Sequence, residues 1–80
     1  MARFVFRDLH TYHQAHQRGI SWEMVEYALD HPENIRPARL IPGRPPTVLY
    51  VATLDSRRLR VYVEMDSDAL TIATVAWEDR

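Results

Sequence analysis

Four side chains on one predicted strand have the chemistry to act on a phosphodiester. In the segment 58–65, polar and apolar residues alternate, so the polar set should point to a single face of a sheet. That set is Arg58, Arg60, Tyr62 and Glu64. Arginine contacts phosphate, tyrosine stacks on a base and glutamate accepts a proton, and a metal-independent ribonuclease needs groups of these kinds. The same alternation is typical of a solvent-exposed strand face with a cross-strand ion pair.

Two residues of the N-terminal half extend this candidate site. His10 could act as an acid or base near neutral pH, which would make it catalytic together with Arg58, Arg60 and Tyr62. Arg18 could bind a phosphate of RNA. Both also have structural interpretations. A histidine at a helix start can pack or bond to the backbone, and an arginine in a last helical turn interacts with the free carbonyl groups and the helix dipole.

Arginines outside the predicted helices form the remaining RNA-binding candidates. They are Arg36, Arg39, Arg44 and Arg57. The helix-borne histidines at positions 10, 13 and 16 are spaced by three, and they fan across about 120° of a helix with 3.6 residues per turn. No glutamate lies among them. We therefore expect no metal site and no cofactor.

Two helices are predicted around the run Arg18-Gly19-Ile20-Ser21. Asp8 is a suitable N-cap for a helix that reaches about Arg18, and Gly19 can take the left-handed conformation that ends it. Ser21 then caps a second helix, which Pro32 closes. A turn this short predicts a helix hairpin. The inner stripe of the first helix is expected to consist of Leu9, Tyr12, His13 and His16.

The rest of the chain alternates with period two and predicts strands. Candidate strands lie at 3–7, 35–41, 47–54, 58–65 and 69–77, with turns at 42–46, 55–57 and 66–68. The apolar run of the last strand suits an interior position. We predict one α+β domain over residues 1–80. Its helix hairpin should pack on one face of a three- to four-stranded, mostly antiparallel sheet.

Composition excludes several classes of function. The net charge is -1, so no overall positive field attracts nucleic acid. There is no cysteine and no lysine, which excludes thiolate zinc sites, Schiff-base chemistry and a Walker-type phosphate lysine. No apolar run approaches the roughly 20 residues that span a bilayer, and the N-terminus lacks the apolar stretch of a signal peptide. We therefore expect a cytoplasmic protein that does not act at a membrane.

The run 10–21 resembles the opening signature of the domain of unknown function 4258 family. That signature has a histidine, a helical stretch and then Arg-Gly-Ile-Ser, which His10 and the residues 18–21 match. Gln14 stands where the family commonly has a further arginine. The resemblance continues through Pro32 and the segments 59–63 and 70–75, and it covers the chain from about Phe6 to Trp77.

This family is similar in layout to small bacterial toxins of the RelE/ParE and BrnT type, which place two helices against an antiparallel sheet. Several of those toxins cleave messenger RNA and are neutralised by an antitoxin encoded beside them. The resemblance implies a RelE-like endoribonuclease that needs no metal, with RNA and an antitoxin as partners. A homodimer is a further expectation for so small a domain. The alternative is a non-enzymatic protein-binding module, an inhibitor or adaptor, which the net charge of -1 favours because RNA-cleaving toxins tend to be basic.

Overall fold

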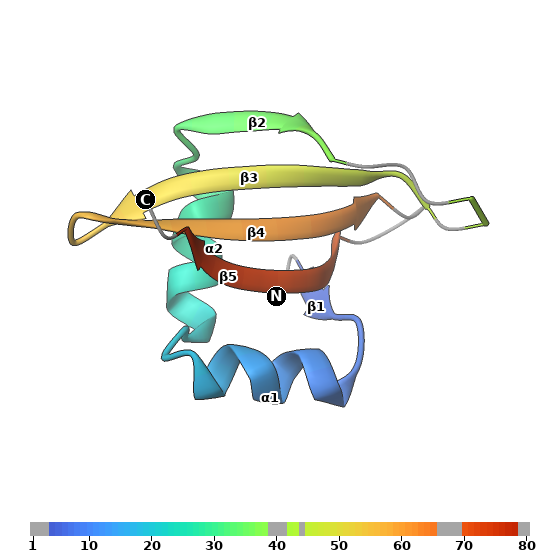
Figure 1. The fold of residues 1–80 in the computed structure, drawn as a ribbon, viewed down its shortest axis with the longest axis horizontal. Helices are drawn as coiled ribbons and strands as arrows, with labels where there is room; N and C mark the ends of the chain where they lie inside the picture. Colours follow the sequence, from blue (N-terminus) through green and yellow to red (C-terminus); the bar gives the residue numbers. More distant parts are fainter. Residues whose placement is uncertain (1–3, 39–41, 44, 66–69, 79–80) are drawn as a thin grey trace.

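Five strands form one mixed sheet, and two helices pack against it (Figure 1). The computed structural model describes residues 4–38, 42–43, 45–65 and 70–78. In chain order the elements are β1 (Phe4–Phe6), α1 (Leu9–Gln17), α2 (Trp22–Asp30), β2 (Asn34–Pro37), β3 (Thr47–Leu54), β4 (Arg57–Met65) and β5 (Leu70–Glu78). The α+β class predicted from the sequence is confirmed. The sheet has five strands in the order β1-β5-β4-β3-β2, so the expected count of three to four is wrong.

Strand β1 lies within the predicted strand 3–7, and it joins the sheet by pairing with the far end of the chain. Phe4 lies opposite Leu70 and Phe6 opposite Ile72, in a parallel arrangement. The other three pairings, β2–β3, β3–β4 and β4–β5, are antiparallel, as the short predicted turns require. The first and last strands pair in parallel without a connecting turn between them. No local pattern in the sequence therefore indicates this pairing. The interior position expected for the last strand is confirmed, because β5 lies between β1 and β4.

The turn between β3 and β4 is as tight as a hairpin allows. Leu54 pairs with Arg57, so only Asp55 and Ser56 lie between the strands. Both have positive φ angles, 50° for Asp55 and 69° for Ser56. This is the backbone of a two-residue hairpin turn whose twist matches that of the flanking strands.

The helix boundaries follow the predicted caps. Asp8 accepts a hydrogen bond from the Thr11 amide at 2.8 Å, and Ser21 accepts one from the Met24 amide at 3.2 Å. Between the helices, Gly19 has a φ of +73°, which a residue with a side chain rarely adopts. The short connection around Gly19 is therefore confirmed.

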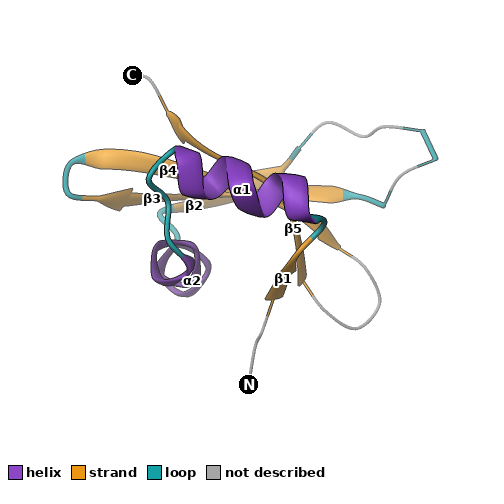
Figure 2. Cartoon of the chain, turned by 90° about the horizontal axis from the view of Figure 1, so that it is seen from below, coloured by secondary structure: helices purple, strands orange, loops and turns teal. Residues whose placement is uncertain are grey.

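The two helices nevertheless do not form a hairpin. Helix α1 packs on β5 and β1, whereas α2 packs on β3 and β4. Figure 2 shows α1 lengthwise and α2 end-on, so their axes cross steeply. A short turn fixes how close two helix ends lie, but the curved sheet beneath them sets the angle between their axes. The predicted hairpin is wrong for this reason, and the helices cover different parts of the sheet.

The buried side of α1 is not the predicted stripe. Thr11 and Ala15 are 3% and 2% exposed, whereas Leu9 is 68% and Tyr12 47% exposed. His13 and His16, the other members of the stripe, are exposed as well. The Thr11 hydroxyl donates to Asp8 Oδ1 at 2.9 Å and contacts the Ala73 carbonyl at 3.4 Å. Small and hydroxyl-bearing residues let α1 lie close to β5, but they give a weak hydrophobic signal in the sequence.

The core lies between the helices and the sheet. Leu59, Val61 and Val63 of β4 are fully buried there, and Val25 of α2 packs with them. At the edge of this core Trp22 stacks on Phe4, with ring centroids 4.2 Å apart. Neither described helix has the length and apolar character needed to cross a bilayer.

Candidate functional site

The four polar residues of β4 lie on the face of the sheet opposite the helices. Their neighbours along the strand, Leu59, Val61 and Val63, are 0% exposed beneath the helices. In the alternating positions, Arg58 is exposed, Arg60 and Tyr62 are half-buried, and Glu64 is buried. The predicted common face is therefore present, and we call the side that carries these four residues the open face.

A row of residues crosses the open face at Tyr62. Tyr62 pairs with Leu49 on β3 and Thr74 on β5, and Leu49 pairs in turn with Arg36 on β2. Directly paired residues point to the same side of a sheet, so Arg36 lies on the open face as well. The register between β4 and β5 shifts between Tyr62 and Val63, which is a β-bulge. Bulges re-aim side chains and are over-represented beside active sites.

Arg58 and Arg60 are held by carboxylates. Glu78 lies 3.7 Å from Arg58 Nη1 and 3.5 Å from Arg60 Nε, and Glu33 lies 3.8 Å from Arg58 Nε. The Arg60 Nε atom is shielded from solvent and makes no hydrogen bond among the described residues, so its pairing with Glu78 is loose. The Arg58 side chain is 58% exposed. Exposed pairs contribute only about 0–1 kcal/mol, so a phosphate could replace the carboxylates that contact Arg58 at little cost.

Glu64 is paired with an arginine from the other end of the chain. Arg7 Nη1 lies 3.5 Å from Glu64 Oε2, in contact range but at the limit of a hydrogen bond. The Glu64 side chain is 10% exposed and that of Arg7 37%. Arg7 follows β1 directly and reaches Glu64 because β1 joins the sheet beside β5. Arg7 could not be identified from the sequence because the parallel pairing of β1 with β5 has no local signal.

The other predicted site residues are not brought to this face. His10 is exposed on α1, in the helical layer. Arg18 Nη1 donates to the Val75 carbonyl at 2.6 Å, and the Arg18 carbonyl accepts from Trp77 Nε1 at 2.8 Å. Arg57 places its guanidinium 3.9 Å from the centre of the Trp77 ring. These contacts tie the end of α1 to β5 and to the β3–β4 hairpin.

The remaining predictions concern loops and metal ligands. Arg39 and Arg44 lie outside the described residues. Within the described part of the chain, no group of three or more His, Asp or Glu residues is arranged to hold a metal ion. His10, His13 and His16 are all exposed on α1.

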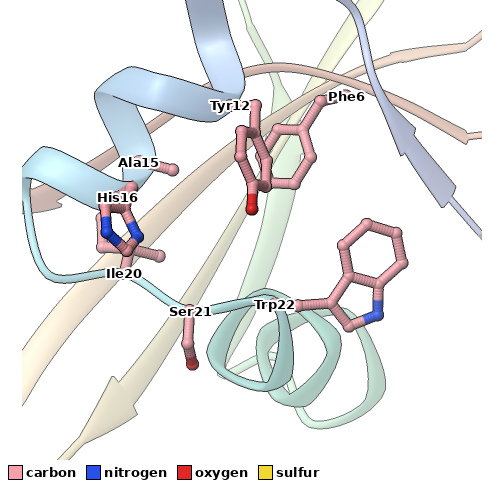
Figure 3. Close-up of a pocket in the computed structure, with 7 residues that line it drawn as sticks. All are labelled: Phe6, Tyr12, Ala15, His16, Ile20, Ser21 and Trp22. Carbon is pink, nitrogen blue, oxygen red and sulfur yellow. The ribbon is translucent and has the colours of Figure 1, made fainter. Parts of the chain in front are cut away.

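A cleft on the helical side is a second candidate site (Figure 3). It has a volume of about 200 Å³ and lies between β1 and the two helices. Its walls include Phe6, Tyr12, His16, Ile20, Ser21 and Trp22. Two of these residues, Tyr12 and His16, belong to the stripe of the first helix that was expected to face the core.

Comparison with known proteins identifies the family of the chain. The model of the family described as Domain of unknown function (DUF4258) matches residues 9–77, from the start of α1 almost to the end of β5. No curated protein and no solved structure matches the chain. The matched region contains both helices, β2 to β5 and the cleft residues of α1 and α2. The chain therefore belongs to the DUF4258 family.

Proposed function

We propose that the chain is a toxin-like domain that binds messenger RNA on its open face and cleaves it without a metal. Two helices against a largely antiparallel sheet resemble the layout of RelE-type toxins. One observation carries the proposal: a nearly buried carboxylate, Glu64, is held by Arg7 on the same strand face as Tyr62 and Arg60. The proposal places the chain in the bacterial cytoplasm, with an antitoxin as its protein partner.

The residues of the open face can be assigned to the steps of RNA cleavage. Glu64 takes the proton of a 2′-hydroxyl, and the 2′-oxygen attacks the adjacent phosphorus. The bond from phosphorus to the 5′-oxygen breaks, and that oxygen takes a proton from Tyr62, leaving a 2′,3′-cyclic phosphate and a 5′-hydroxyl. Arg7 and Arg60 stabilise the charge that develops on the phosphate oxygens. His10 has no role in this scheme because it lies in the helical layer.

The experiment combines RNA cleavage with a matched carboxylate-to-amide control. Purified protein is mixed with labelled single-stranded RNA in excess EDTA, and the cleavage rate is compared among the native chain, Glu64→Gln and Asp55→Asn. Loss of an acid or base typically costs about 10²-fold or more in rate, which we expect for Glu64→Gln. Asp55 lies in the β3–β4 turn, and its variant should cleave like the native chain. Intact RNA with the native chain, or equal rates for all three, would refute the proposal.

The pairing of the open-face arginines favours a second candidate. Glu33 and Glu78 offset the charge of Arg58 and Arg60, and this weakens the attraction to a polyanion. The second candidate function is a non-enzymatic protein-binding module. Induction of the native chain in bacterial cells separates the two. Arrested growth with fragmented messenger RNA supports the ribonuclease, whereas normal growth with intact RNA at high expression supports the binding module.

A further inference from the structure

The cleft on the helical side is lined by aromatic side chains that pack against one another. Tyr12 meets Phe6 edge-on with ring centroids 5.6 Å apart, and Trp22 lies 5.9 Å from Phe6 in a tilted arrangement. Trp22 also stacks on the buried Phe4 at 4.2 Å. Because the rings support one another, a ligand would meet a preformed surface and would not have to order it.

Much of this aromatic surface remains in contact with solvent. Tyr12 is 47% and Trp22 38% exposed. Figure 3 shows the hydroxyl end of Tyr12 directed toward the opening between His16 and Trp22. Trp22 Nε1 donates no hydrogen bond to any described residue, whereas Trp77 Nε1 donates to the Arg18 carbonyl. Tyrosine and tryptophan with free polar tips are the residue types that dominate binding energy at protein interfaces.

The charge of helix α2 beside the cleft is negative. Glu26 lies one helical turn after Trp22, on the same side of α2, and Glu23 follows Trp22 directly. Neither Glu23 nor Glu26 contacts a cation in the described part of the chain. On the open face, by contrast, Glu33, Glu64 and Glu78 each contact an arginine. Helix α2 itself carries no basic residue to balance its acids.

Aromatic faces and carboxylates attract the same kind of ligand. The face of an indole or phenol ring carries partial negative charge and binds ammonium and guanidinium groups. Free carboxylates beside it add attraction for cations and repel phosphate. We propose that the cleft docks a basic segment of a protein partner, with an arginine or lysine side chain against Tyr12 and Trp22 and its charge facing Glu26. This site is separate from the open face proposed to bind RNA.

The test follows the two indole signals of the full chain by nuclear magnetic resonance. The probe is a short synthetic peptide of arginine and leucine with blocked ends. We expect a saturable shift of the Trp22 indole signal and a much smaller shift for Trp77. Tyr12→Ala should weaken binding by about fivefold or more, the usual effect of truncating an interface anchor. Glu26→Gln, which alters only a surface charge, should weaken it by about two- to fivefold.

A matched control comes from the same helical layer. Tyr27 on α2 is 46% exposed, nearly the same as Tyr12, but it packs on His31 and does not line the cleft. Tyr27→Ala should therefore bind the peptide like the native chain. The spectrum of each variant shows whether its fold is intact, and Glu26→Gln still tests the proposal if Tyr12→Ala does not fold.

Four results would overturn the proposal. The first is equal binding of a control peptide in which glutamate replaces arginine. The second is an unchanged peptide affinity in both single variants, Glu26→Gln and Tyr12→Ala. If Tyr12→Ala does not fold, an unchanged affinity in Glu26→Gln is enough. The third is a Trp22 shift produced by a single-stranded RNA oligonucleotide, which would assign the cleft to nucleic acid. The fourth is a shift that appears on raising the protein concentration alone, which would assign it to a second copy of the chain.

Discussion

The orientation of α1 in the structure and the hydrophobic pattern of its sequence predict opposite effects on stability for two substitutions. Leu9→Ala removes a large apolar side chain, and Ala15→Leu adds one. If the predicted stripe faced the core, the first change would be the damaging one. In the structure Leu9 is 68% exposed and Ala15 is 2% exposed. The free energy of unfolding should therefore fall little in Leu9→Ala and substantially in Ala15→Leu.

The magnitudes follow from the packing at each position. A surface substitution away from special features usually changes the free energy of unfolding by at most about 0.5 kcal/mol, which we expect for Leu9→Ala. Ala15 belongs to the core cluster that contains Ile72 and Val75 of β5. Forcing extra methylene groups into such a site typically costs about 1–3 kcal/mol. In a domain of this size, each 1 kcal/mol lowers the melting temperature by roughly 4–8 °C.

Urea and thermal unfolding of the two variants and the native chain measure the difference. Far-ultraviolet circular dichroism follows the transition, and the slope of the urea curve checks that each variant unfolds as the native chain does. Thr11→Val is a useful third variant because it keeps the shape of a buried side chain but removes its hydroxyl contacts with Asp8 and Ala73. A larger loss of stability in Leu9→Ala than in Ala15→Leu would show that α1 is rotated differently on the sheet.

Two further predictions concern the turn and the first cap. Ser56→Gly should raise the free energy of unfolding by about 0.5–1 kcal/mol, since Ser56 has a φ of 69° that glycine adopts without strain. Urea unfolding measures this change, and a destabilised variant would contradict the turn geometry. Two hydrogen bonds lower the pKa of Asp8: the larger effect comes from the Thr11 backbone amide and the smaller one from the Thr11 hydroxyl. The cap therefore stabilises the fold at pH values above the unfolded-state pKa of Asp8. This contribution is lost as the pH falls through the folded-state pKa. In Thr11→Val the pKa of Asp8, followed by carboxyl chemical shift, should move part of the way back toward its ordinary value, and an unmoved pKa would exclude the hydroxyl as a cause.

Features that depend on neighbouring residues could be predicted from the sequence. The caps at Asp8 and Ser21 and the strand alternation at 58–65 each depend on a few adjacent positions, and all are confirmed. The position of β1 and the pairing of Arg7 with Glu64 depend on contacts between opposite ends of the chain. No periodicity reports such a contact. The rotation of α1 was missed for another reason: its buried side is built from Thr11 and Ala15, and the more hydrophobic stripe faces solvent.

The candidate site was predictable to the same extent. Alternation alone places Arg58, Arg60, Tyr62 and Glu64 on one face, because the strand has period two. It cannot show that Glu33 and Glu78 already hold two of these arginines, since Glu33 lies before β2 and Glu78 ends β5. It also cannot separate His10, Arg18 and Arg57 from the open face, because that separation depends on which side of the sheet the helices cover.

The two proposed surfaces lie on opposite faces of the sheet, and this separation limits how one could affect the other. A peptide docked between Tyr12 and Trp22 does not cover Tyr62 or Glu64, so binding in the cleft by itself leaves the open face accessible. Strand β1 and the residue after it nevertheless connect the two surfaces. Phe6 forms part of the cleft wall, and the next residue, Arg7, contacts Glu64. A ligand that displaces Phe6 would therefore act on the ion pair that holds the proposed catalytic carboxylate, whereas one that leaves Phe6 in place would bind independently of RNA.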